Sequence, residues 1–574
     1  MTSSKPHRRW GLLVLTVLAL WMVAVVVLLV AGFLSLRSGQ QDAEAVREAG
    51  ARPLLQGRTV ARLERAADRF ATADRRLSSP ALAPLRILPV AGRQVRSAEA
   101  IAAAAERVAR EGLAGVGLGR AELRGGGGRG LDRVEQVRRL GALADRTNAR
   151  LARVSLGPSA GLVGPLGRAR WELESTVADL RRGLARGSAA ATAFADLLGG
   201  PRSYLVFAAN PSEMRAGSGM FLSVGNMRTG EGSVDVTGMA SVTNVAVPAG
   251  VAIDGDLAAR WGWLAPQTDW RNLVLSPRFP DSAALAARMW EAGGHGPVDG
   301  VLALDALALR AVLAATGPVQ AAGLDITADN VVEELTHTQY TRYPDLSERD
   351  ERRESLSAIA TAVMQALSER EWSAEVLADG LARAARGRHV LLWSSRPSEQ
   401  RGWTAAGLDG TVRADSLMVS VLNRGGNKLD YWLPSDVRLD LRAVGDHTEG
   451  SIRMRLRNTT PPDEPAYVAG PHYGLPLQPG EYLGLAAVTL PGSASGGRFE
   501  GVDQLAVAGA DGPTRVIATE FQLPRGEERT IVVRFRLPGR HGALHVEPSA
   551  REPSVPWSFR AERWRDDRAH TVRW

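Results

Sequence analysis

Arginine and carboxylate side chains lie close together in several segments of this chain, and such groups bind anions or hold divalent cations. The segment NPSEMRAGSGMF carries Glu213 and Arg215 just before Gly217 and Gly219. We expect a strand to end near Asn210 and to deliver Glu213 and Arg215 into a loop. There they either bind a phosphate or carboxylate group, or form a hairpin connection with an ion-paired arginine.

A carboxylate also marks the end of a buried strand predicted at 298–304. Asp305 follows this strand and precedes a helix predicted at 306–315. Ligands of α/β proteins collect at the carboxyl ends of such strands, so Asp305 is a candidate general base or Mg²⁺ ligand. The alternative is that Asp305 only caps the following helix.

A third group of charges lies between residues 345 and 354, at the start of a helix predicted at 352–369. Arg349 and Arg352 are three residues apart and are expected to share a helix face, and Arg353 adds a third guanidinium group. Asp345 is a second candidate metal ligand. These arginines either bind an anion or pair with neighbouring acids such as Asp350.

The last candidate lies in the segment NRGGNKLDYW. Of 70 basic residues in the chain, only Lys5 and Lys428 are lysines. Where arginine replaces lysine almost everywhere, Lys428 indicates a need for a compact ammonium group. The alternative is a plain hairpin turn at Gly425 and Gly426.

These assignments give one candidate site. We predict catalytic roles for Asp305, Arg349 and Arg352, anion binding by Glu213, Arg215, Arg353 and Lys428, and metal binding by Asp305 and Asp345.

The composition limits the classes of protein to which the chain can belong. The 574 residues contain no cysteine, which excludes disulfides, thiolate metal sites and cysteine nucleophiles. The net charge is +8, and the excess of arginine, alanine and glycine is typical of a GC-rich genome, such as that of an actinobacterium. The glycine-rich runs lack the context of a nucleotide-binding loop, and no His-x-x-x-His pair indicates a zinc hydrolase.

An unbroken apolar run from Gly11 to Leu34 predicts a membrane-spanning helix within 11–36. Its 24 residues, at about 1.5 Å each, are long enough to cross a bilayer. Lys5, Arg8 and Arg9 precede the run, so we expect residues 1–10 in the cytoplasm and the remainder outside the plasma membrane, in a single-pass arrangement. The alternative is a cleaved signal peptide. An outward-facing chain is not expected to bind nucleic acid.

Hydrophobic periodicity divides the rest of the chain into three parts, and the fold class is multi-domain α+β. Three- and four-residue spacing of apolar residues predicts a bundle of three or four helices over 40–198. Strands alternating with helices predict an α/β layered domain over 201–395, including a hairpin near 221–242 and a helix at 281–294. Short strands separated by turns predict a β-sandwich over 400–574, with the segment KLDYWLP as one strand.

Four segments together resemble a known envelope family, the one catalogued as domain of unknown function 4012. They are YLVFAANPSEMRAGSGMF, NLVLSPRFPDSAALAARMWE, VDGVLALDALALRAVLAATGPV and NRGGNKLDYWL. The central part is distantly similar to the LytR-CpsA-Psr phosphotransferases, which are single-pass proteins that move glycopolymers from a polyprenyl-pyrophosphate carrier to peptidoglycan. Arg215 matches their first arginine, Gly317-Pro318-Val319 their middle element, and 349–353 their Arg-x-x-Arg-Gln element, with Arg353 in place of glutamine.

Two functions follow from these observations. The first is a non-catalytic envelope protein that binds wall glycan or partner proteins of the envelope. The alternative is a phosphotransferase that acts on a polyprenyl-linked glycan, with Mg²⁺ as its cofactor. The departures from the phosphotransferase motif favour the first.

Overall fold

The computed structural model describes residues 57–124, 129–247, 249–471 and 474–574, and isolated residues between 25 and 38. The predicted membrane span at 11–36 lies mostly outside the described residues. Among those that are described, no helix has the length and apolar character needed to cross a membrane. The chain divides into two compact units, Met1–Gly125 with Arg138–Ala191, and Gly126–Val137 with Thr192–Trp574.

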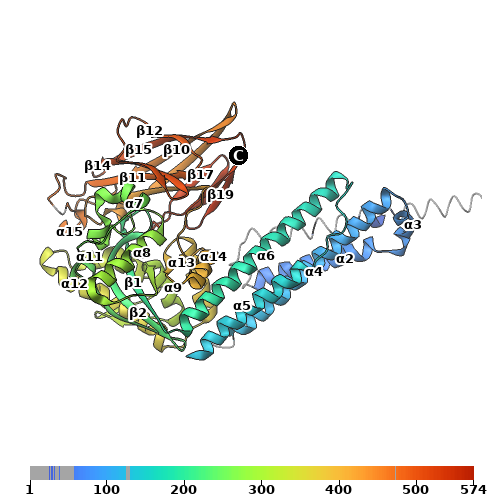
Figure 1. Ribbon diagram of the computed structural model, residues 1–574, viewed down its shortest axis with the longest axis horizontal. Helices are drawn as coiled ribbons and strands as arrows, with labels where there is room; N and C mark the ends of the chain where they lie inside the picture. Colours follow the sequence, from blue (N-terminus) through green and yellow to red (C-terminus); the bar gives the residue numbers. More distant parts are fainter. Residues whose placement is uncertain are drawn as a thin grey trace, which may run out of the picture. The chain divides into compact units, whose positions relative to one another are not determined.

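The first unit is helical, as predicted for this part of the chain. Its long helices are α2 (Gly57–Leu77), α4 (Ala91–Arg124), most of α5 (Leu131–Ala152) and most of α6 (Gly164–Gly199), with the short α3 (Ala83–Arg86) before α4 (Figure 1). The buried faces of α2 and α4 carry alanines such as Ala66, Ala73, Ala102 and Ala105. Side chains this small allow two helix backbones to approach closely.

The second unit begins with a five-stranded sheet. Its strands are β1 (Arg202–Met214), β2 (Gly219–Gly230), β3 (Ser233–Ser241), β4 (Gly300–Leu304) and β7 (Val390–Ser394), in the order β3-β2-β1-β4-β7. β1 and β4 are parallel, and the other neighbours are antiparallel. The predicted hairpin is confirmed as β2 and β3, whose turn places Glu231 and Gly232 at positive φ.

Alternate residues of β1 face two different layers, because successive strand side chains point to opposite faces. Leu205 and Phe207 belong to one buried cluster, and Tyr204 and Val206 to another. The first cluster includes α8 (Phe279–Trp290), and the second includes α9 (Ala306–Thr316), α12 (Arg349–Glu369) and α13 (Ala374–Arg386). The first cluster also contains side chains of the C-terminal strands, so both regions share a core.

The C-terminal region forms two six-stranded sheets, drawn in orange and red in Figure 1. One contains β8 (Ser416–Asn423), β11 (Tyr482–Pro491), β13 (Val507–Asp511), β14 (Thr514–Leu523), β16 (Ala543–Val546) and β19 (His570–Arg573). The other contains β9 (Ser435–Val444), β10 (His447–Arg457), β12 (Ser495–Phe499), β15 (Glu528–Pro538), β17 (Pro556–Phe559) and β18 (Glu562–Arg565). Both sheets contribute to one large hydrophobic cluster.

The remaining elements are short. They are α7 (Gly255–Trp261), α10 (Val331–Glu333), α11 (Gln339–Arg342), α14 (Pro397–Ala406), α15 (Ala466–Ala469), β5 (Val319–Ala321) and β6 (Leu324–Ile326).

One predicted strand is wrong. The segment KLDYWLP instead contains the 3₁₀ helix η10 (Leu429–Trp432), and Gly425 and Gly426 lead into it rather than into a second strand. The apolar and polar residues alternate here as they do in a strand. Lys428 and Asp430, however, are both buried and bonded to other elements, and these contacts override the local pattern.

Candidate functional site

Glu213 lies on a strand and not in the loop predicted for it. Pairing with β2 is irregular after Asn210 but resumes at Met214, so β1 continues beyond the predicted end. Glu213 is therefore buried, and Arg215 occupies the connection to β2, where its backbone N–H donates to the carbonyl of Ser218. Gly219 has no space for a side chain, because a Cβ would lie 2.4 Å from the carbonyl carbon of Asn210.

Lys428 and Glu213 meet, although 215 positions of the sequence separate them. The Nζ atom of Lys428 forms an ion pair with Oε1 of Glu213, and the side chains are only 7 % and 3 % exposed. The rings of Tyr340 and Tyr467 lie 5.1 and 5.5 Å from Nζ. Burial lowers the pKa of Lys428 to about 7, because a charged ammonium loses its hydration there.

Asp430 accepts hydrogen bonds from four residues in different parts of the chain. The donors are the backbone N–H of Met214 at 3.0 Å, the amide of Asn423 at 3.0 Å, the hydroxyl of Tyr482 at 3.0 Å and the guanidinium of Arg551 at 2.7 Å. Asp430 is buried, so these donors replace its hydration. It joins β1 to the C-terminal sheets.

Arg215 contacts neutral oxygens. Its Nη1 atom donates to the carbonyls of Met214 at 3.1 Å and Asn423 at 2.8 Å, and Nη2 donates to the side chain of Asn272 at 3.4 Å. Burial lowers the pKa of Arg215 to about 10. The geometry is that of a buried structural arginine. We give the name buried polar junction to the charged residues Glu213, Arg215, Arg352, Lys428, Asp430 and Arg551 together with the tyrosines that contact them, Tyr340, Tyr467 and Tyr482.

The three arginines of α12 lie in different environments. Arg352 is 1 % exposed, its guanidinium carbon lies 3.5 Å from the ring centroid of Tyr467, and it donates to the carbonyl of Tyr343. Arg349 and Arg353 instead approach the exposed carboxylate of Asp350, at 3.7 and 3.4 Å. The structure therefore brings Arg352 into the junction and leaves outside it both the half-exposed Arg349 and the partly buried Arg353.

Asp305 is hydrogen-bonded to residues outside the buried polar junction. One carboxylate oxygen accepts from the backbone N–H of Leu307 at 2.9 Å, which caps α9, and the other lies 2.7 Å from Nδ1 of His389. Burial lowers the pKa of His389, but the charge and hydrogen bond of Asp305 outweigh it and raise the pKa above its usual value.

A small cavity lies beside Asp305 at the carboxyl ends of β1 and β4. Asp305, Asn210 and Tyr340 line it, and its volume is about 50 Å³. A few water molecules fit into such a volume, whereas a prenyl chain does not.

The two carboxylates predicted to hold Mg²⁺ have separate structural partners. Asp345 is exposed and forms a capping box with Glu348 at the start of a 3₁₀ turn, and Asp305 caps α9. Within the described ranges, no group of three His, Asp or Glu side chains is arranged around a common point. These residues do not fit a Mg²⁺ site.

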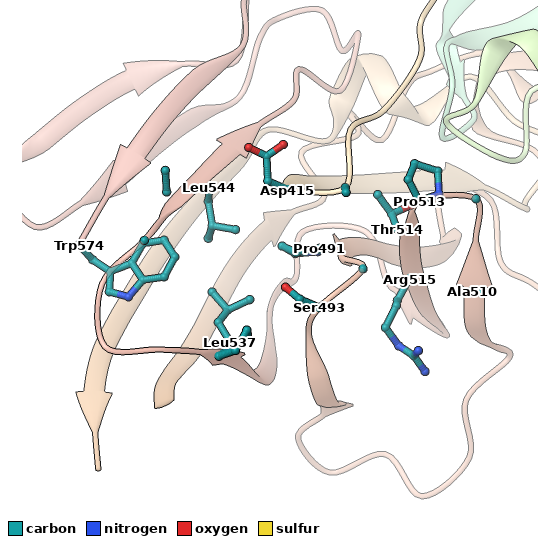
Figure 2. Close-up of a pocket in the computed structure, with 16 residues that line it drawn as sticks. Asp415, Pro491, Ser493, Ala510, Pro513, Thr514, Arg515, Leu537, Leu544 and Trp574 are labelled. Atoms are coloured by element: carbon teal, nitrogen blue, oxygen red, sulfur yellow. The ribbon is translucent and has the colours of Figure 1, made fainter. Parts of the chain in front are cut away.

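A groove with a volume of about 640 Å³ lies at one end of the C-terminal sheets. Figure 2 shows Trp574, Leu537 and Leu544 on one side of it and Thr514 and Arg515 on the other. Polar residues Asp415 and Ser493 lie between the two sides. We call this cavity the C-terminal groove.

Sequence reasoning missed several residues of these sites. Tyr340, Tyr467, Tyr482 and Arg551 come from four separate segments, and only the fold brings them together. Asp430 carried a usable signal, since it is an acid two residues after the single lysine beyond the N-terminal tail. The groove has no local motif, because its lining comes from the ends of several strands.

Comparison with known proteins identifies one family and no individual relative. No curated protein and no solved structure matches this chain. Residues 199–340, which include β1, Glu213, Arg215 and Asp305, match the model of the family described as Protein of unknown function (DUF4012), the family that the sequence motifs predicted.

Proposed function

We propose that this protein is a non-catalytic component of the cell envelope that binds wall glycan through the C-terminal groove. The apolar run at 11–34 and the basic residues before it support an anchor in the plasma membrane, with the bulk of the chain outside. The groove itself is the observation that carries the proposal.

The dimensions and lining of the groove suit a saccharide. Ligand sites of about 300–1,000 Å³ combine a mostly apolar wall with a few polar groups that fix orientation. The volume of the groove, about 640 Å³, is in this range. The indole of Trp574 offers a flat apolar surface to the C–H face of a sugar ring, and Asp415 and Ser493 offer partners for its hydroxyl groups.

One group of the groove, the guanidinium of Arg515, suits a glycan with acidic substituents. Arg515 is an exposed lining residue, and a guanidinium group binds carboxylates and phosphates in a planar geometry. Peptidoglycan and many wall polymers carry such groups.

The environment of the buried polar junction argues against the alternative function, a phosphotransferase. Arg215, Arg352 and Asp430 contact groups of the chain itself and are shielded from water. A transferase site for a pyrophosphate donor needs several arginines directed at one open space. Within the described residues, these arginines do not converge on such a space.

Sedimentation with insoluble peptidoglycan tests the proposal on the full-length chain. Arg515→Ala is expected to weaken binding about tenfold, since one charge-assisted hydrogen bond of about 1.5 kcal/mol is lost. Arg498→Ala removes another exposed arginine, outside the groove, and is the matched control.

The aromatic wall has its own control. Trp574→Ala is expected to reduce binding, whereas Trp171→Ala removes a tryptophan that is 69 % exposed on the helical unit and should leave binding unchanged. Equal binding by wild type, Arg515→Ala and Trp574→Ala would contradict the proposal. Saturable binding of a prenyl pyrophosphate, lost in Arg349→Ala/Arg353→Ala, would favour a transferase instead.

A further inference from the structure

The contact between Lys428 and Glu213 is chemically unlike the other ion pairs of the second unit. Almost every basic position of the chain is arginine, but the one that meets Glu213 in the interior is a lysine. Arginine supplies the same charge with a better hydrogen-bonding geometry. What lysine has and arginine lacks is a primary amine that becomes a nucleophile when it loses its proton.

The surroundings of the pair favour the uncharged forms of both groups. The rings of Tyr340 and Tyr467 lie within 5.5 Å of Nζ, and both side chains of the pair are shielded from water. Glu213 Oε1 receives no hydrogen bond from any other group in the described part of the chain. An ion pair that is desolvated in this way, without further hydrogen bonds, regains little of its hydration energy.

We propose that Lys428 and Glu213 are joined by an intramolecular amide bond, formed within the folded chain. The neutral amine of Lys428 attacks Cδ of the protonated Glu213 carboxyl group, and a C–N bond forms. One C–O bond of that carboxyl group then breaks, and its oxygen leaves as water after taking a proton from the nitrogen. The step consumes no other reactant and releases one water molecule.

The fold supplies the conditions that this condensation needs. Two groups held in contact react with effective molarities of about 10⁵–10⁸ M, and exclusion of water opposes the reverse hydrolysis. The pKa of about 7 for Lys428 makes the neutral amine available near neutral pH. Asn210 donates to the hydroxyl of Tyr340 at 2.8 Å, which positions the tyrosine ring beside Nζ.

The bond would connect distant parts of the second unit. It joins the end of β1 to the segment between β8 and β9, and it closes the chain between 213 and 428 into a loop. The chain contains no cysteine and therefore no disulfide. An amide at this position gives a covalent link between the α/β sheet and the C-terminal sheets that needs no oxidant.

Intact mass spectrometry of the full-length chain tests the proposal without any variant. The denatured wild-type protein is expected to be lighter than its sequence mass by one water, about 18 Da. The Lys428→Arg and Glu213→Ala variants should each have their full sequence mass. A wild-type protein at its full sequence mass would overturn the proposal, and so would a water loss that persists in Lys428→Arg.

Tryptic peptide mapping locates the bond. Trypsin does not cleave after an acylated lysine, so the wild type should yield a branched peptide in which 203–215 is joined to 425–438. Lys428→Arg should release 203–215 as a free peptide. Free 203–215 and complete cleavage after Lys428 in the wild-type protein would overturn the proposal, whether or not either variant folds.

Discussion

The buried polar junction and the C-terminal groove use similar residues in opposite ways. Both contain arginine, aspartate and aromatic side chains within the second unit. In the junction, the guanidinium of Arg551 and the carboxylate of Asp430 are bonded to each other and shielded from water. In the groove, Arg515 is exposed, and Asp415 pairs with the exposed Arg413 at 2.6 Å but stays 41 % exposed, so both are accessible to a ligand.

This difference shows that residue type alone does not identify a binding site. A charged group that has lost its water must be bonded to the protein itself, and its removal then affects stability. A charged group that stays hydrated contributes little to the free energy of folding and remains available to bind a ligand. The comparison therefore predicts large effects on stability in the junction and large effects on binding in the groove.

Removal of the junction's central carboxylate is expected to have the largest effect. Asp430→Ala leaves the buried guanidinium of Arg551 without its ion-pair partner, and should lower the free energy of unfolding by about 3–5 kcal/mol. Urea denaturation followed by tryptophan fluorescence measures this change. Asp436→Ala, which removes one partner of an exposed ion pair with Arg455, is the control and should change stability little, because solvent screens exposed pairs.

The buried and the exposed arginine of α12 should likewise differ in how much they contribute to stability. Arg352→Ala removes a buried cation stacked on Tyr467 and is expected to cost about 2–3 kcal/mol. Arg349→Ala removes a half-exposed side chain and should change stability by about 0.5 kcal/mol at most. Equal losses of stability in the two variants, measured by urea denaturation, would contradict the distinction between them.

The contact of His389 with Asp305 predicts a dependence on pH. The pKa of His389 is raised above its unfolded value near 6.5, so the folded state holds this proton more tightly. The resulting stability is fully present below about pH 6.5 and is lost as the pH rises through the folded-state pKa. His389→Gln should flatten this part of the pH profile of unfolding, and an unchanged profile would exclude His389 as its source.

The smallest effect on stability is expected in the groove. Arg515→Ala should change the free energy of unfolding by less than about 0.5 kcal/mol, because Arg515 is exposed. Its effect should fall on glycan binding instead. A thermal denaturation experiment on the variant used for sedimentation tests whether weaker binding has a cause other than unfolding.

The regular elements could be predicted from the sequence because their signals are local. The strand predicted at 298–304 includes β4, and the helix predicted at 306–315 is one residue shorter than α9. The N-cap interpretation of Asp305 is also a local inference, and the hydrogen bond from Leu307 confirms it.

The candidate site could be predicted only in part. Glu213, Arg215, Arg352 and Lys428 do come together, but Arg349, Arg353 and Asp345 do not. The sequence did not reveal that Glu213 continues a strand, because the pairing of β1 with β2 is irregular between Asn210 and Met214. It could not reveal that η10 replaces a strand, because Lys428 and Asp430 are bonded to residues more than 100 positions away. The groove depends on strand ends that only the sheet topology brings together.

Calorimetric titration of the full-length chain with soluble peptidoglycan fragments tests the central claim most directly. Two double variants provide the comparison, Asp415→Ala/Arg515→Ala in the groove and Arg349→Ala/Arg353→Ala on α12. We predict saturable binding by the wild type and by the α12 variant, and its loss in the groove variant. Absence of binding by the wild type, or loss of binding only in the α12 variant, would contradict the assignment of the groove as the functional site.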